Sequence, residues 1–173
     1  IYAEIPINYI SFGKTKTSLF NTTDWVDAFT NAHIATDLEE NGNRFITSAK
    51  DDYFINQSTT INVYFFHQVQ LKVFFKTSDK SPLPSSPTFS YFSFGALVNA
   101  YNDSTIWVDA NTNASFTSTL YSSNNLERWI VSNNSLVVSS PEEIDIIYNH
   151  QYYVSILPNL QDAGTVSYTH LTL

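Results

Sequence analysis

The sequence predicts an all-β fold made of two tandem β-sandwich modules of the immunoglobulin-like kind. Three observations lead to this prediction. The chain repeats itself at intervals of about 82 to 84 residues, apolar and polar residues alternate with a period of two, and helix signals are scarce. Clusters of Asn, Ser, Asp and Pro separate the expected strands at intervals near ten residues. This spacing favours a sandwich over an α/β fold.

The internal repeat is visible in matched segments that keep their order along the chain. WVDAFTNAHI begins at Trp25, and WVDANTNASF begins at Trp107, 82 residues later. YISFG and YFSFG end at Gly13 and Gly95 and keep the same spacing, whereas NRFITS and ERWIVS are 84 residues apart. Small drift in a fixed order is what loop insertions produce in a duplicated unit.

The strongest strand signal is the alternation in NVYFFHQVQLKVFF, residues 62–75. Its apolar residues are expected on one face, and Asn62, Gln68, Gln70 and Lys72 on the other. The matched segment of the second copy alternates in the same way. Its expected inner face consists of Ile144, Ile146, Tyr148, Tyr152, Val154 and Ile156. The best helix candidate, AHIATDLEENGN, is short and is interrupted by the turn dipeptide Asn41-Gly42.

The predicted module boundaries lie near His67 and His150, because the long strand passes there from one copy to the next. The first module is then residues 1–67 and the second is residues 68–150. Residues 151–173 are either the first strand of a third module or a C-terminal tail.

On this division the second module begins with a strand whose counterpart is missing from the first, unless IYAEIPINYI replaces it. An unmatched terminal strand, either Gln151 to Leu157 or Tyr2 to Ile10, could fill this gap in a neighbouring copy by strand addition. The alternative is that every strand pairs within one chain.

The amino-acid composition excludes several classes of partner and site. Charged residues make up only 14% of the chain, the net charge is -8 and there is no basic cluster, which argues against nucleic-acid and anionic-lipid partners. The chain has no cysteine for disulfides or thiolate metal sites, and no apolar run is long enough to span a membrane. The start at Ile1, without a leader-like region, indicates a mature or excised segment.

Five N-x-[ST] motifs are candidate glycosylation sites. An Asn-, Ser- and Thr-rich chain also forms such motifs by chance, so two interpretations stand: a glycosylated secreted surface, or plain solvated loops. The candidate acceptors are Asn21, Asn56, Asn102, Asn113 and Asn133.

The chain resembles, over roughly residues 60–167 and through the internal repeat over residues 9–60, the tandem β-repeat modules of archaeal and bacterial secreted and cell-surface proteins, most of all those of thermoacidophilic archaea. WVDANTNASF, ERWIVSNNSLVVSS, IDIIYNHQYYVSI and GTVS carry the resemblance. It implies a sandwich module, an extracellular setting and no catalytic residues. The glycine that usually follows W-x-x-A is Phe29 in one copy and Asn111 in the other, so the turn could differ between copies. YTHLTL replaces the usual continuation after GTVS.

The residues that recur at matched positions are candidate anchors of the repeat: Gly13, Gly95, Trp25, Trp107, His67 and His150. Trp25 and Trp107 are interpreted as packing anchors rather than sugar-stacking platforms, and Trp129 as a core residue.

Two further pairs recur. Asp27 and Asp109 are interpreted as turn caps rather than calcium ligands. His67 and His150 are either a pH-sensitive contact between modules or, as favoured here, histidines satisfied by a backbone carbonyl.

No catalytic, cofactor-binding or metal-ligating residue is predicted, and we expect the segment not to be an enzyme. The acidic pairs at 39–40, 51–52 and 142–143 are interpreted as solvated turns, because adjacent strand residues point to opposite faces. No Ser-His-Asp order, metal-binding HExxH motif or phosphate-binding glycine loop is present.

Two functions follow. The leading hypothesis is a structural module of a stalk, surface layer or filament at the cell surface, whose partners are copies of itself, other surface proteins or glycans. The alternative is an accessory or carbohydrate-binding domain of a secreted hydrolase, which requires exposed aromatic side chains on one face.

Overall fold

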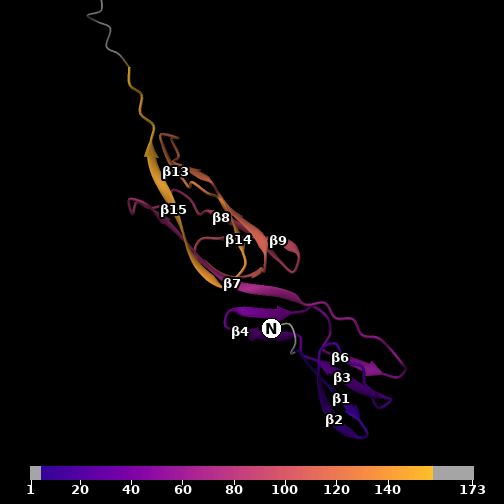
Figure 1. Cartoon of the computed structure of the whole chain (residues 1–173). Helices are drawn as coiled ribbons and strands as arrows, with labels where there is room; N and C mark the ends of the chain where they lie inside the picture. Colours follow the sequence, from indigo (N-terminus) through magenta and orange to yellow (C-terminus); the bar gives the residue numbers. More distant parts are fainter. Residues whose placement is uncertain (1–4, 158–173) are drawn as a thin grey trace, which may run out of the picture.

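The computed structural model describes residues 5–157, and this part of the chain is all-β without a helix. Figure 1 shows an elongated molecule in which one run of strands follows the other along its length. The first run is β1 (Pro6–Ser11), β2 (Lys14–Leu19), β3 (Thr30–Ile34), β4 (Asp37–Glu40), β5 (Asn43–Ile46), β6 (Asp52–Ile55) and β7 (Phe66–Thr77). The second is β8 (Thr88–Ser93), β9 (Ala96–Tyr101), β10 (Ser104–Asp109), β11 (Thr112–Phe116), β12 (Thr119–Tyr121), β13 (Glu127–Ile130), β14 (Ser135–Val138) and β15 (Glu142–Tyr152).

The strands form three sheets whose inner faces enclose the core. Two sheets have four strands, in the orders β2-β1-β3-β6 and β14-β11-β8-β9. The third has the order β12-β13-β15-β7-β5-β4, and β10 also pairs with β7. In the larger core, Phe89 and Phe116 of a four-stranded sheet pack with Leu71 and Trp129 of the long sheet. Two sheets facing each other across one core agree with the predicted β-sandwich class.

Strands of the first run have counterparts in the second with the same partners. β1 pairs with β2 and β3, and β8 pairs with β9 and β11. β3 pairs with β6 as β11 does with β14, and β5 pairs with β4 and β7 as β13 does with β12 and β15. The register is also matched, since Phe45 lies opposite His67 and Trp129 lies opposite His150.

Strand β7 exchanges partners along its length. Residues 66–69 pair with β5, residues 68–73 pair with β10, and residues 71–77 pair in parallel with β15. The exchange falls just after His67, near the predicted module boundary. Val69, Leu71 and Val73 are buried, as the alternation predicted.

The second half of β7 lies between two segments that have no strand counterparts in the first run. β10 matches residues 22–27 and the start of β15 matches residues 59–65, and neither stretch belongs to a strand. β1 does not replace the missing strand, because it lies between β2 and β3 as β8 lies between β9 and β11. The prediction of an unmatched N-terminal strand is therefore wrong for residues 6–10, and residues 2–4 lie outside the described part.

The inner face predicted for the second copy is correct only up to His150. Ile146 and Tyr148 are buried, but Tyr152, Val154 and Ile156 are 67%, 71% and 89% exposed. The reason is that pairing with β13 ends at Tyr152, and beyond it the segment has no neighbouring strand among the described residues. The remainder of the predicted tail, residues 158–173, lies outside the described part.

The turn after W-x-x-A is the same in both copies. Phe29 and Asn111 both have φ of 62°, in the left-handed region. The Phe29 amide donates to the Ile55 carbonyl and the Asn111 amide to the Val138 carbonyl, both at 2.7 Å. Because this cross-strand hydrogen bond holds the backbone, the expected difference between the two turns does not occur.

Candidate functional site

A buried polar network surrounds Gln68, at the point where β7 passes between the two runs of strands. The Gln68 side-chain carbonyl accepts hydrogen bonds from Arg44 Nε and Nη2 at 2.9 and 2.7 Å. Its amide donates to Asp109 Oδ1 at 2.8 Å and to Ser93 Oγ at 3.1 Å. The Gln68 side chain is fully buried, although the alternation placed it on the polar face. Side chains of both runs cover that face here, which strand periodicity alone does not reveal.

Trp107 joins the same junction from β10. The guanidinium of Arg44 lies over the Trp107 ring, 4.5 Å from its centroid, in a cation–π arrangement. Arg44 comes from the first run of strands and Trp107 from the second, so the contact ties the two together.

The other two tryptophans lie in contrasting environments. Trp129 is buried in the core, as predicted, whereas Trp25 is 87% exposed. The interpretation of Trp25 as a packing anchor is therefore wrong within this chain, because the described residues supply no counterpart of Arg44 above its ring.

Asp27 and Asp109 cap matched hairpin turns. Asp109 accepts hydrogen bonds from the amides of Phe94 and Gly95 at 3.0 and 2.6 Å, and Asp27 accepts them from the amides that precede β2, those of Phe12 and Gly13, at 3.0 and 2.7 Å. The turn-cap interpretation is confirmed, although each carboxylate caps a hairpin about 15 residues earlier rather than its own turn. Both glycines have positive φ, as the second position of such a turn requires.

His67 and His150 occupy matched places but have different partners. His67 Nε2 lies 3.2 Å from Asn43 Oδ1, and the pKa of His67 is lowered by burial. His150 Nδ1 lies 2.7 Å from Asp79 Oδ2, and its Nε2 lies 3.0 Å from Glu127 Oε2. The Asp79 carboxylate raises the pKa of His150, and Glu127 adds to this effect. The ring nitrogens of His150 both contact carboxylates, so the expected satisfaction by a backbone carbonyl is wrong for His150.

The Asp79 carboxylate interacts with Ser81 as well as with His150. Its Oδ1 accepts hydrogen bonds from the Ser81 hydroxyl at 2.7 Å and from the Ser81 amide at 3.0 Å. Ser81, together with His150, lowers the pKa of Asp79 well below its usual value. The Ser81 hydroxyl also accepts a hydrogen bond from the indole of Trp129 at 3.1 Å, so the loop after β7 is tied to the core.

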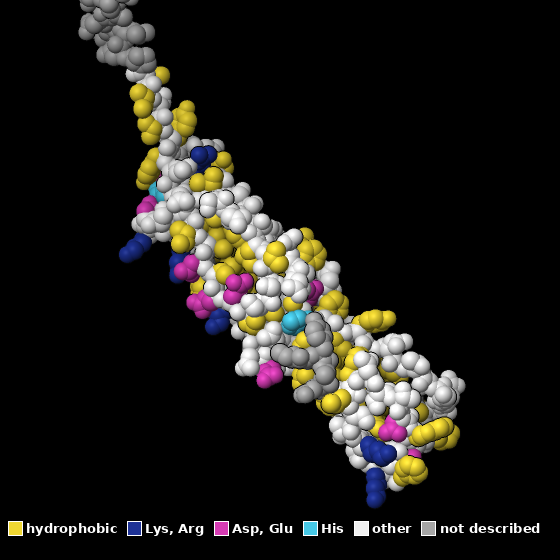
Figure 2. Space-filling model, in the orientation of Figure 1, with side chains coloured by type: hydrophobic (Ala, Val, Ile, Leu, Met, Phe, Trp, Pro, Cys, Tyr) yellow, Lys and Arg dark blue, Asp and Glu magenta, His cyan; other side chains and the backbone are white. Residues whose placement is uncertain are grey.

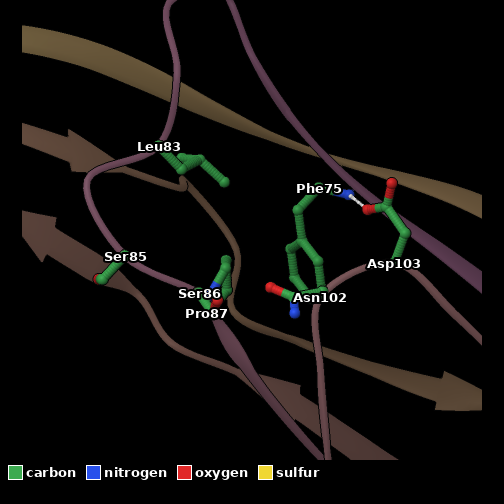
Figure 3. A pocket seen from close by; sticks show the side chains of 7 residues that line it. All are labelled: Phe75, Leu83, Ser85, Ser86, Pro87, Asn102 and Asp103. Atoms are coloured by element: carbon green, nitrogen blue, oxygen red, sulfur yellow. Dashed lines mark hydrogen bonds between the residues drawn. The ribbon is translucent and has the colours of Figure 1, made fainter.

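Two cavities in the described part of the chain do not bring a nucleophile together with a base. The larger, about 340 Å³, lies between the loop before β8 and the turn at Asn102 and Asp103. Figure 3 shows Phe75 beside that turn and Leu83 on the loop across from it. The amide of Phe75 donates to Asp103 Oδ1 at 2.8 Å. The other, about 230 Å³, is mostly apolar and is lined by Ile5, Phe20, Phe45, Val63, Tyr64, Phe65 and His67.

One exposed group of possible metal ligands lies on the first run of strands. Ligand atoms of His33, Asp51 and Asp52 lie within 4.8 Å of one another, and His33 Nδ1 is 3.1 Å from Asp52 Oδ1. All three side chains are exposed, as expected for the acidic pair at 51–52, and we assign no metal to them.

The five candidate glycosylation asparagines are all exposed to solvent, which is a requirement for attaching a glycan: Asn21, Asn56, Asn102, Asn113 and Asn133. Glycosylation at these positions stays a prediction.

Comparison of the chain with protein-family models, with curated proteins and with solved structures found no match. No helix capable of crossing a membrane occurs among residues 5–157.

Proposed function

We propose that this chain is a non-catalytic, extracellular structural module of a cell surface, part of a stalk, surface layer or filament. The observation that carries the proposal is the parallel pairing of β7 with β15, from Leu71 opposite Glu142 to Thr77 opposite Tyr148. This parallel pairing determines how the second run of strands responds when the chain is pulled from its two ends.

Tension would enter the second run at the start of β7 and leave it at the end of β15. Because the two strands run in the same direction, such a pull slides one strand along the other. Hydrogen bonds that cross between strands are then loaded together rather than opened one by one. Antiparallel pairing of β10 with residues 68–73 adds a second ladder on the other side of β7. This arrangement suits a module that transmits force.

The recurring side chains support the same proposal. Asp27 and Asp109 hold turns, and Gln68 with Arg44 holds a strand junction. Each of these groups is used in contacts within the scaffold. Neither cavity gathers a set of groups suited to acid–base or nucleophilic chemistry.

Single-molecule pulling tests the proposal. The chain has no cysteine, so attachment points can be introduced freely. A handle at each terminus loads the β7–β15 ladder along its length. Handles at Lys76→Cys and Ile147→Cys, which are exposed and lie opposite each other, peel the same ladder from one end. We expect a several-fold higher unfolding force for the first geometry. Equal forces in the two geometries would contradict the proposal.

One observation favours the alternative of a carbohydrate-binding accessory domain, namely the exposure of Trp25. An exposed indole is a stacking surface for a sugar ring. A pull-down with insoluble polysaccharides should then show binding that Trp25→Ala removes and that Phe12→Ala, a change at a similarly exposed aromatic residue, leaves intact. Absence of binding by the wild-type chain to any polysaccharide rejects this alternative.

A further inference from the structure

The internal junction at β7 has two halves, and each half recurs at one end of the molecule. Ser93, Trp107 and Asp109 form the half that receives β7, and the repeat places Ser11, Trp25 and Asp27 at the matching positions. Arg44 and Gln68 form the half that is inserted, and the repeat places Arg128 and Gln151 at the matching positions.

The C-terminal half-junction is already assembled in the described chain. Arg128 Nε donates to Gln151 Oε1 at 2.8 Å, as Arg44 Nε donates to Gln68 at 2.9 Å. The backbone hydrogen bonds of the two half-junctions also match. The Tyr153 amide donates to the Leu126 carbonyl at 2.8 Å, and the Gln70 amide donates to the Gly42 carbonyl at 2.7 Å. The chain therefore leaves the second run of strands along the path by which β7 leaves the first.

The segment that leaves is apolar on the face that β7 buries. Tyr152, Val154 and Ile156 match Val69, Leu71 and Val73, which are 0%, 0% and 1% exposed. In the C-terminal segment the same positions are more than two-thirds exposed. Figures 1 and 2 show this segment extending beyond β13 with its hydrophobic side chains uncovered.

The first run of strands carries the matching gap. In the second run, β7 lies between β10 and the start of β15. By the repeat, residues 22–27 and residues 59–65 of the first run match those two segments, and neither of them belongs to a strand. Ile61 and Val63 match Ile144 and Ile146, which pair with β7. Val63 is buried in the smaller core with Ile5, whereas Trp25 is exposed where Trp107 receives Arg44.

We propose that residues 151–157 of one copy of this chain add as a strand between residues 22–27 and residues 59–65 of a second copy, which joins copies head to tail. The new strand runs antiparallel to residues 22–27 and parallel to residues 59–65, as β7 runs with respect to β10 and β15. This inference rests on the proposed structural function and names its partner.

The internal junction also sets the register and the polar contacts. Tyr152 lies opposite Val26 and Ile156 lies opposite Thr22, because Val69 pairs with Val108 and Val73 pairs with Ser104. Arg128 of the inserting copy covers Trp25 of the receiving copy, and Gln151 donates to Asp27.

One position departs from the internal template. Asp24 stands where the second run has Ile106, and its carboxylate accepts a hydrogen bond from the hydroxyl of Tyr9. The pKa of Asp24 is lowered, with this hydrogen bond as the main cause. The acceptor segment is thus polar at its middle, and Val26, Trp25 and the 59–65 segment supply the apolar contacts.

Disulfide trapping tests the register. A chain with Val26→Cys and a chain with Tyr152→Cys, distinguished by tags of different size, are mixed and oxidised. Residues opposite each other in an antiparallel pair have Cα atoms about 4.5–5.5 Å apart, within disulfide reach. We expect a cross-linked heterodimer. The matched control pairs Val26→Cys with Ser155→Cys, which is out of register and on the other face. Equal yields from the two pairs would overturn the proposal.

Sedimentation velocity tests the direction of assembly. Ile156→Asp prevents the C-terminal strand from inserting into another copy, and Trp25→Ala weakens the site that receives that strand. Each change should weaken self-association about thirtyfold, the effect of a central interface residue. Both residues are exposed within one copy, so the variants keep the fold, which circular dichroism checks. Ser155→Lys is the control, because its counterpart Lys72 is exposed. A mixture of the Ile156→Asp and Trp25→Ala chains should stop at heterodimers, since each retains one working end.

Each outcome separates this inference from the proposed function. Chains that stay monomeric at all concentrations overturn strand addition but leave the single-chain pulling result unchanged. Monomeric chains that bind a synthetic peptide of residues 66–77 show that the gap takes a strand of another module, which overturns the second copy as occupant. If both the Ile156→Asp chain and the Trp25→Ala chain still self-associate, copies of the chain contact each other through another face, and strand addition is overturned.

Discussion

The imidazole of His150 lies flat on the indole of Trp129, with 4.2 Å between ring centroids and 8° between ring planes. The matched pair in the first run, His67 on Phe45, has the same arrangement at 4.6 Å and 12°. Both are cross-strand pairs between the long strand and the hairpin beside it. The stacking therefore belongs to the repeated scaffold, while the charges around each imidazole differ.

His150 should stabilise the fold most at low pH. The Asp79 carboxylate raises its pKa above the ordinary value of 6.5, so the folded state holds the proton more tightly than the unfolded state. This contribution is complete below the unfolded pKa and is lost as pH rises through the folded pKa. An NMR titration of the imidazole should show the raised pKa, and Asp79→Asn should lower it. An unchanged midpoint in Asp79→Asn would contradict the assignment.

His67 should have the opposite effect. Burial lowers its pKa, so the unfolded state takes up a proton at a higher pH than the folded state does. Stability should therefore fall as pH drops from 6.5 towards the folded pKa. Urea unfolding of His67→Gln and His150→Gln between pH 8 and pH 5 should shift the pH dependence of the free energy of unfolding in opposite directions. Shifts of the same sign would contradict this account.

The left-handed residue at the W-x-x-A turn should be a site of strain. Phe29 and Asn111 share φ of 62°, a conformation that costs Phe more free energy than it costs Asn. We expect Phe29→Asn to raise the free energy of unfolding by about 1 kcal/mol and the reciprocal Asn111→Phe to lower it by about 1–2 kcal/mol. Denaturant unfolding of both variants checks this. Contact of Phe29 with Phe54, at 6.3 Å between centroids, offsets part of the strain, so a loss of stability in Phe29→Asn would mean that this contact dominates.

Gln68 should contribute far more to the stability of the fold than Gln70, the next residue on the same face of β7. Gln68→Ala leaves Arg44, Ser93 and Asp109 without their shared partner and should cost about 2–3 kcal/mol. Gln70→Ala is the control, because Gln70 is only half-buried, and it should change stability by less than about 0.5 kcal/mol. Urea unfolding measures both. Equal costs would show that the network does not hold the junction.

Removing the two capping carboxylates should reduce the free energy of unfolding by different amounts, more for Asp109 than for Asp27. Asp109 is 7% exposed and accepts hydrogen bonds from two turn amides and from Gln68, whereas Asp27 caps its turn at a more exposed site. We expect Asp109→Ala to cost about 3 kcal/mol and Asp27→Ala about 1 kcal/mol, because buried donors left without an acceptor are more costly. Thermal unfolding of both variants would reveal the order, and a reversed order would contradict it.

Much of the scaffold could be predicted because it depends on local patterns. The alternation along β7 placed Val69, Leu71 and Val73 in the core, and Asn41-Gly42 forms the hairpin turn between β4 and β5. The predicted burial is wrong at positions where a segment distant in the sequence decides whether a side chain is covered. Gln68, expected on a polar face, is buried, and the expected inner face at Tyr152, Val154 and Ile156 has no opposing sheet among residues 5–157.

The sequence by itself determined the all-β class and the recurrence of matched segments, because period-two alternation and an internal repeat are properties of the residue order alone. Only the tertiary structure decided that Trp107 is covered by Arg44 while Trp25 stands exposed, and that β7 serves both runs of strands. The physical reason is that burial depends on which segment lies alongside. Identical residues at matched positions therefore differ in burial when, among the described residues, one has a neighbouring strand and the other does not.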